Sequence, residues 1–157
     1  MNHSWTAPTF SEPQSVGSRD WGTEELLELA SKEWMLKKLF IKKGSKGGLQ
    51  YHRLKNEGGY LVSGKLLVRF GFPNTGLEEK ILSPGDSFHF PPMCIHQEEA
   101  LSDCLILEVS TTHFNDRVRV EDLFGIEDKT LGGLPSTNLH DIEQVDCTCV
   151  VFFSLHL

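Results

Sequence analysis

The chain has 157 residues, a length that fits one domain with terminal extensions. Fifteen Lys and Arg residues stand against 22 Asp and Glu residues, which gives a formal net charge of −7. Nucleic acids and anionic membranes bind basic surfaces, so this balance argues against both as the main partner. No secretory signal, bilayer-spanning apolar stretch or CxxC pair is recognisable in the sequence. We therefore expect a soluble cytoplasmic protein with reduced thiols.

Composition divides the chain into three parts. Residues 1–20 are rich in Ser, Pro, Thr and Asn and predict an irregular arm, and residues 21–126 carry the domain. Residues 127–157 form a C-terminal extension whose last 13 residues are strongly apolar. Those residues could be an added strand, an extension left by cloning or a reading-frame artefact. If they were exposed, they would be an aggregation hazard.

The domain is predicted to begin with a short helix over residues 23–32. Thr23 can cap its N-terminus, and acidic residues follow in the first turn. From about residue 34 the pattern changes to short strands. The expected strands are 34–43, 49–54, 59–64, 65–72, 78–86, 87–90, 95–101 and 104–111.

Gly, Pro and Asn residues separate these strands at intervals of roughly ten residues. This spacing indicates an all-β sandwich or barrel, because βαβ units would place longer helical segments between the strands. The sequence contains no internal repeat, so we expect a single jelly roll. The polar, acidic residues 112–144 then predict an excursion with one short helical turn.

Four polar residues from two separate segments form the candidate site. Gln50 and His52 are two apart on a predicted strand, so their side chains point to the same face. Glu57 follows a step that can return the chain to that face, and His96 comes from a later strand. Two imidazoles, a carboxylate and an amide oxygen suit one divalent ion, with Zn favoured over Mn, Fe, Ni or Co. The alternative is a metal-free sandwich lined by the same four residues.

The two segments resemble the motifs of the cupin superfamily, G-x5-H-x-H-x3,4-E-x6-G and G-x5-P-x-G-x2-H. The matching positions are His52, Glu57 and Gly64 in the first motif and Gly85, Pro91 and His96 in the second. Gln50 takes the place of the first His, and Met93 takes the place of a Gly. The resemblance implies a single cupin (RmlC-like) jelly roll that binds one metal ion.

Six short segments narrow the resemblance to the cupin domain of type II mannose-6-phosphate isomerases, a domain often fused to GDP-mannose pyrophosphorylase. The segments are WG-x-E-E (21–25), LQYH (49–52), VSG (62–64), PP-x3-H (91–96), EVST (108–111) and VRVED (118–122). That family also has LQYH at its metal, so Gln50 matches a family trait. The resemblance covers about residues 20–126 and implies a homodimer with a role in carbohydrate metabolism.

Two pairs of glycines depart from that family. Gly58-Gly59 stand where it has a His-Trp-like pair, and Gly47-Gly48 stand where it has larger residues. Strand parity places Gly59 on the inward face with Glu57. We therefore expect either an enlarged space there, able to hold something bulkier than mannose 6-phosphate, or a close approach by substrate or backbone.

Three further residues are candidates for the site. The resemblance implies that Arg119 lies near the substrate phosphate, although an ion pair with Glu121 or Asp122 is an equal alternative. Lys46 shares the strand parity of Gln50 and could face the same space. His89 could touch the site, but an edge-facing position is favoured. No residue is identified as the catalytic base, for which a water molecule or His89 are the candidates.

Three functions fit these residues. The first is a metal-dependent enzyme acting on a phosphorylated or nucleotide-linked sugar, by aldose–ketose isomerisation. The second is a cupin dioxygenase, because a fold alone does not set the reaction. The third is a non-catalytic module that binds a metal or a sugar. In each case the partner is a small molecule.

Overall fold

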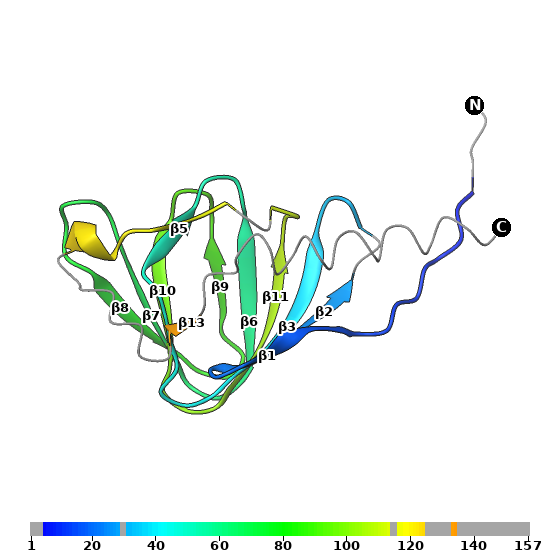
Figure 1. Cartoon of the computed structure of the whole chain (residues 1–157), viewed down its shortest axis with the longest axis horizontal. Helices are drawn as coiled ribbons and strands as arrows, with labels where there is room; N and C mark the ends of the chain where they lie inside the picture. Colours follow the sequence, from blue (N-terminus) through cyan, green and yellow to red (C-terminus); the bar gives the residue numbers. More distant parts are fainter. Residues whose placement is uncertain (1–4, 29–30, 114–115, 125–132, 135–157) are drawn as a thin grey trace.

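The computed structural model describes residues 5–28, 31–113, 116–124 and 133–134. Two β-sheets pack face to face (Figure 1). The elements are β1 (Gln14–Arg19), β2 (Gly22–Glu28), β3 (Met35–Ile41), β4 (Lys46–Gly47), β5 (Gln50–His52), β6 (Glu57–Ser63), β7 (Leu66–Gly71), β8 (Glu78–Leu82), β9 (Ser87–Phe90), β10 (Ile95–Ala100), β11 (Cys104–Ser110), β12 (Arg117–Arg119), the 3₁₀ turn η1 (Glu121–Phe124) and β13 (Gly133–Leu134).

The six-stranded sheet has the order β1-β2-β3-β11-β6-β9. The seven-stranded sheet runs β12-β5-β10-β4-β13, and β7 pairs with both β10 and β8. All pairs are antiparallel except the short pair of β4 with β13. The predicted single all-β jelly roll is confirmed.

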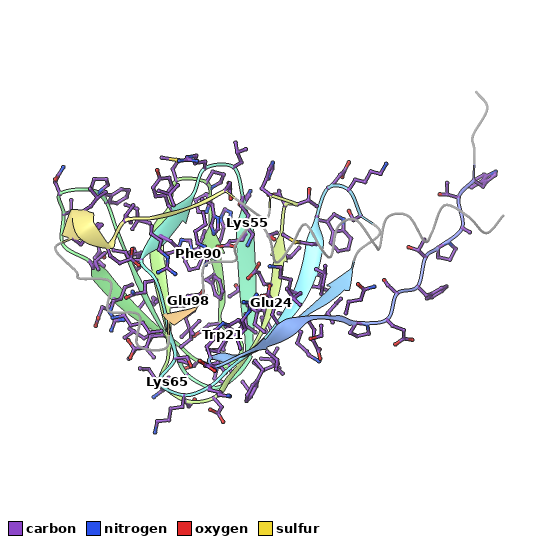
Figure 2. The ribbon with its side chains drawn as sticks, viewed as in Figure 1. Trp21, Glu24, Lys55, Lys65, Phe90 and Glu98 are labelled. Carbon is purple, nitrogen blue, oxygen red and sulfur yellow. The ribbon has the colours of Figure 1, made fainter. Side chains whose placement is uncertain are left out.

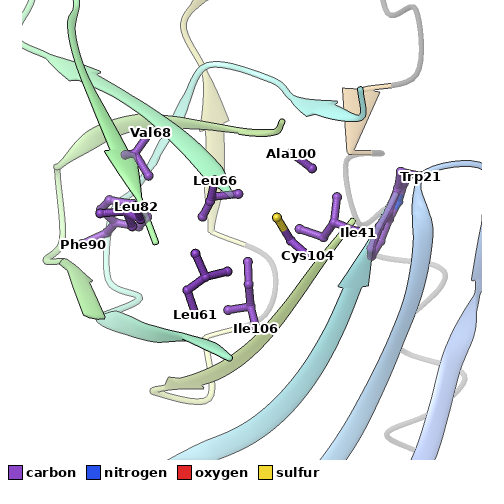
Figure 3. Packing of buried hydrophobic residues seen from close by; sticks show 10 residues of the cluster. All are labelled: Trp21, Ile41, Leu61, Leu66, Val68, Leu82, Phe90, Ala100, Cys104 and Ile106. Atoms are coloured by element: carbon purple, nitrogen blue, oxygen red, sulfur yellow. The ribbon is translucent and has the colours of Figure 1, made fainter. Parts of the chain in front are cut away.

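The space between the sheets is apolar at one end, which is shown in Figure 3. The buried members of this cluster are Trp21, Ile41, Leu61, Leu66, Val68, Leu82, Phe90, Ala100, Cys104 and Ile106. A second, smaller cluster of Leu49, Ile95 and Val120 packs with Phe124 of η1. The polar residues of the candidate site therefore lie next to a well-packed apolar core, which can hold the inward-facing strands rigidly.

The predicted helix over residues 23–32 is wrong, because residues 22–28 form strand β2. Alternation explains the strand: Leu26 is buried, and Glu24 is paired with Lys37 of β3, while Glu25 pairs with Lys38 on the other face. Hydrogen bonds to β1 and β3 on both sides outweigh a weak helix propensity. Tertiary pairing thus decides the conformation of this segment.

Part of the expected N-terminal arm is also regular. Residues 14–19 form β1, which pairs with β2, whereas the preceding exposed residues 5–13 extend away from the sandwich (Figure 1). The short strands β4 and β12 and the turn η1 were not individually predicted, although one helical turn was expected after residue 112. The apolar last 13 residues lie outside the described residues. In the part of the chain that is described, no helix has the length and apolarity of a membrane span.

Candidate metal centre

The centre is formed by His52, Glu57 and His96, all of them buried. His52 and His96 come from neighbouring strands of the seven-stranded sheet, β5 and β10, whereas Glu57 begins β6 of the other sheet. Glu57 Oε1 lies 3.3 Å from His96 Nε2 and 3.6 Å from His52 Nε2. One ligand atom of each residue lies within 4.8 Å of the others. The three residues therefore join the two sheets at one point.

Hydrogen bonds fix the orientation of both imidazoles. His52 Nδ1 donates to Asp116 Oδ1 at 3.0 Å, and His96 Nδ1 donates to the Cys94 carbonyl at 2.9 Å. The His96 ring also stacks on Phe90, with centroids 4.1 Å apart. These contacts turn each Nε2 toward Glu57, as second-shell partners do for metal-binding histidines.

His96 Nε2 supports a metal at this point. The atom is buried and makes no hydrogen bond within the described part of the chain. When Nδ1 carries the only proton of each ring, two imidazole lone pairs and a carboxylate oxygen converge. A bound ion would take the place of the proton that His96 Nε2 otherwise holds toward Glu57. Such an arrangement favours a cation, and this donor set fits a divalent transition metal.

The ionisation of the group reflects this convergence. Burial by itself would lower the pKa of His96, but the Cys94 carbonyl and Glu57 outweigh it and raise the pKa to about 10. Burial, assisted by Lys55 and His96, lowers the pKa of His52 despite the opposing effect of Glu57. Burial would raise the pKa of Glu57, but His96 and Lys55 hold it well below its usual range. Glu57 is therefore ionised and can serve as a ligand.

A buried lysine, Lys55, holds the other oxygen of this carboxylate. Its Nζ donates to Glu57 Oε2 and, at 3.0 Å, to Glu108 Oε1. Lys37 continues the series, 2.7 Å from Glu24 Oε1 and 3.9 Å from Glu108 Oε1. Figure 2 labels Lys55 and Glu24 in the space between the sheets. This row of alternating charges fixes Glu57 with only Oε1 directed at the imidazoles.

Gln50 lies beside the three ligands but is engaged elsewhere. It is directly opposite His96 in the register of β5 with β10, so the two side chains share a face. Its Oε1 accepts a hydrogen bond from Arg117 Nη1 at 3.2 Å. Gln50 as the fourth ligand therefore stays a prediction.

Arg119 and Lys46 are two further sequence candidates for the site. Arg119 Nη1 is 3.2 Å from Glu121 Oε1, and the guanidinium occupies the space that a side chain at Gly48 would need. Lys46 is opposite Glu99 in the register of β4 with β10, whereas Gln50 is opposite His96 in the register of β5 with β10. His96 and Glu99 are three positions apart on β10 and point to opposite faces, so Lys46 does not share the face of Gln50 as strand parity predicted. A backbone irregularity between β4 and β5 explains the difference.

The two candidates on β9 and β6, His89 and Gly59, contact neighbouring residues of the sandwich. His89 is exposed, and its Nε2 lies 2.7 Å from Asn56 Oδ1. At Gly59 the Phe88 ring fills the space, because a Cβ there would meet Phe88 Cζ at 2.1 Å. The volume left by the missing aromatic pair is thus occupied by a ring from the neighbouring strand.

Sequence reasoning missed four residues around the centre: Lys55, Glu98, Asp116 and Arg117. Glu98 follows His96 by two positions on β10 and shares its face, a signal that strand parity could have given. Burial raises the pKa of Glu98 to about 7, and Glu57 and Glu108 add to the shift against the effect of His96. Figure 2 labels it between the sheets. The other three come from the loop after β5 and from the β12 region, whose positions depend on tertiary pairing.

The structure is a jelly roll with a candidate metal centre between its two sheets. Residues 39–110 match the family model described as Cupin domain, and a solved RmlC-like cupin has the same fold.

Solved structures give the same fold. An RmlC-like cupin from Shewanella frigidimarina is 24% identical, with TM-score 0.53, covering 67% of this chain and 91% of its own. KdgF from Halomonas sp. is 22% identical, with TM-score 0.55, and the match covers 67% of this chain and 94% of KdgF. The capsular polysaccharide assembling protein CapF from Staphylococcus aureus is 20% identical, with TM-score 0.59, covering 70% of this chain and 32% of its own, so this chain corresponds to about a third of CapF. No curated protein matches the sequence.

Proposed function

We propose that this chain is a metal-dependent cupin acting on a phosphorylated or nucleotide-linked sugar, by aldose–ketose isomerisation. The observation that carries the proposal is the buried His52–Glu57–His96 group, placed among charged side chains between the two sheets. A polar ligand can exchange part of its hydration there for contacts with charged groups, whereas an apolar ligand has no such contacts to make. The likeness to CapF, which is named for capsular polysaccharide assembly, is compatible with a sugar ligand.

Different residues of the chain would bind the metal, transfer the proton and hold the phosphate in such a reaction. A divalent ion held by His52, Glu57 and His96 would supply Lewis-acid polarisation of a carbonyl and its neighbouring hydroxyl. Glu98, on the face of His96, is the carboxylate placed to move a proton between two neighbouring carbons. Arg119, which also contacts Glu121, would hold a phosphate through its guanidinium group.

The test is turnover of a substrate panel. Protein loaded separately with Zn, Mn, Co, Ni or Fe is incubated with sugar phosphates and nucleotide sugars in deuterated water, and NMR detects product or deuterium at the exchanging carbon. His96→Ala, which removes a ligand, serves as the inactive control. The proposal fails if no member of the panel is converted or exchanged with any of these metals.

Two further measurements on the same metal-loaded protein distinguish the isomerase from the alternative functions. Oxygen uptake that depends on Fe(II) would identify a dioxygenase instead. A sugar that binds tightly and remains unchanged would identify a non-catalytic module.

A homodimer is part of the proposal. Exposed apolar residues on the outer face of the six-stranded sheet support it, and they are Phe40, Tyr60, Val62 and Val109. Sedimentation velocity should show a dimer, and a monomer at all concentrations would contradict this part.

A further inference from the structure

The two oxygens of the Glu57 carboxylate face different partners. Oε1 lies 3.3 Å from His96 Nε2 and 3.6 Å from His52 Nε2. Oε2 accepts a hydrogen bond from the ammonium group of Lys55. Glu57 and Lys55 are each only 7% exposed, so water is largely kept from this contact. A carboxylate bound in this way presents one oxygen to a metal ion.

Two further contacts hold Lys55 beside Glu57. Its Nζ also donates to Glu108 Oε1 at 3.0 Å, and its backbone N–H donates to Asp116 Oδ2 at 2.7 Å. Glu108 is in turn fixed within β11, where it stands opposite Lys37 of β3. Moving the ammonium group away from Oε2 would separate buried charges from their partners, which is costly. Lys55 therefore keeps Oε2 from serving as a second ligand atom.

The number of oxygens that Glu57 offers matters differently to different ions. Zinc at an open site is bound by three protein atoms, and two imidazoles with one carboxylate oxygen make such a set. Manganese favours six ligands that are mostly oxygen, so the second oxygen of a carboxylate is worth more to it. With Oε2 engaged by Lys55, the two histidines and Glu57 present two nitrogens and one oxygen.

We propose that Lys55 is a positioning residue that limits Glu57 to one-oxygen ligation and thereby strengthens the preference of the centre for zinc over manganese. It acts through Glu57 and does not itself bind the ion. The inference rests on the metal centre of the proposed function but not on isomerisation. A purely structural role for Lys55 would change the stability of the sandwich and leave the preference between the two ions unchanged.

The experiment compares ion preference between the wild type and Lys55 variants. Metal-free full-length protein is titrated with Zn²⁺ and with Mn²⁺, each in competition with a chromophoric chelator suited to that ion. Zinc binds such donors more tightly than manganese in any case, so the change in the ratio of the two affinities is the readout. Lys55→Met frees Oε2, and the preference for zinc should fall by about tenfold or more, within the range of second-shell substitutions.

Cobalt gives a second readout that a structural role would not move. Four-coordinate Co²⁺ absorbs visible light much more strongly than six-coordinate Co²⁺. We expect the Co²⁺-loaded Lys55→Met protein to absorb more weakly than the wild type, because Glu57 can then supply both oxygens.

Two double variants complete the comparison. If Lys55→Met does not fold, the charge-neutral pair Lys55→Met with Glu108→Gln removes the same contact to Glu57. The matched control, Lys37→Met with Glu24→Gln, removes one lysine and one carboxylate at the other end of the row of charges. It should keep the wild-type affinity ratio and the wild-type cobalt spectrum.

An unchanged ratio or an unchanged cobalt spectrum in the Lys55 variants, an equal change in the control, or no binding of either ion by the wild type would each overturn the inference. A ratio that depends on Lys55, without turnover of any sugar, would refute isomerisation and leave the inference standing. Sugar turnover by a protein whose ratio does not depend on Lys55 would do the reverse.

Discussion

Met93 shows how one residue can depart from a motif and still support the site. It occupies the motif's glycine position with φ of 67°, in the left-handed region that favours glycine. Its backbone N–H donates to the His52 carbonyl at 2.7 Å, so the bend before β10 is tied to a ligand residue. The left-handed conformation costs an L-residue about 1–2 kcal/mol. The bend is therefore retained at a cost to stability.

Met93→Gly should stabilise the protein. Relief of the strained φ exceeds the extra chain entropy that glycine loses, so we expect a gain of about 0.5–1 kcal/mol. Thermal unfolding should show a rise in Tm of about 1–4 °C. Met93→Ala keeps the strained φ, and the side chain is exposed, so it should give no such gain. Equal Tm values for the two variants would contradict this explanation.

Asp116 positions His52 without being a ligand. Its carboxylate accepts from His52 Nδ1 at 3.0 Å and from the backbone N–H groups of Leu54 and Lys55 at 2.5 and 2.7 Å. Asp116→Asn should weaken zinc affinity about tenfold to a hundredfold, the usual effect of losing a second-shell carboxylate. Competition with a chromophoric chelator measures it. Asp103→Asn, remote from the centre, should bind zinc normally; a similar loss there would show a non-specific effect.

At the scale of elements, a row of buried and half-buried charges joins the inner faces of β2, β3, β11 and β6. The row alternates in sign and contains Glu24, Lys37, Glu108, Lys55 and Glu57. Charges away from water are tolerated only when they are paired. The row therefore orders these strands relative to one another and presents Glu57 to the opposite sheet.

Lys55→Met should be strongly destabilising, because it leaves Glu57 and Glu108 buried without this cation. Losing one partner of a buried pair costs about 3–5 kcal/mol, which urea unfolding of the metal-free protein would measure. The control Lys38→Met breaks the partly exposed pair with Glu25 and should cost at most about 1 kcal/mol. Similar losses in both variants would mean that burial does not decide the effect.

For the whole molecule, the metal centre is a junction between two layers. Glu57 belongs to one sheet and the two histidines belong to the other, so an ion bound there would link them. A ligand that binds only the folded state stabilises it, by about 2.7 kcal/mol at a concentration of 100 times Kd. Metal should thus affect the stability of the entire sandwich.

Removing the metal should lower the Tm of the wild type by several degrees. His96→Ala should lose this metal dependence, since only two of the three ligands remain. His89→Ala, an exposed histidine bonded to Asn56, should keep it. Thermal denaturation with zinc and with EDTA makes the comparison. The junction would be refuted if the wild type melted at the same temperature in both.

The sequence by itself determined the longer strands between residues 34 and 111, the single jelly roll and the three residues that converge. Alternation and turn residues are local signals, and a motif preserves spacing, so these features can be read along the chain. Only the tertiary structure decided that residues 22–28 form a strand, that Lys46 leaves the ligand face, and that Phe88 fills the space at Gly59. It also brought Lys55, Asp116 and Arg117 to the centre. Register, ion pairs and packing across two sheets join residues far apart in sequence, and no local pattern encodes which of them will meet.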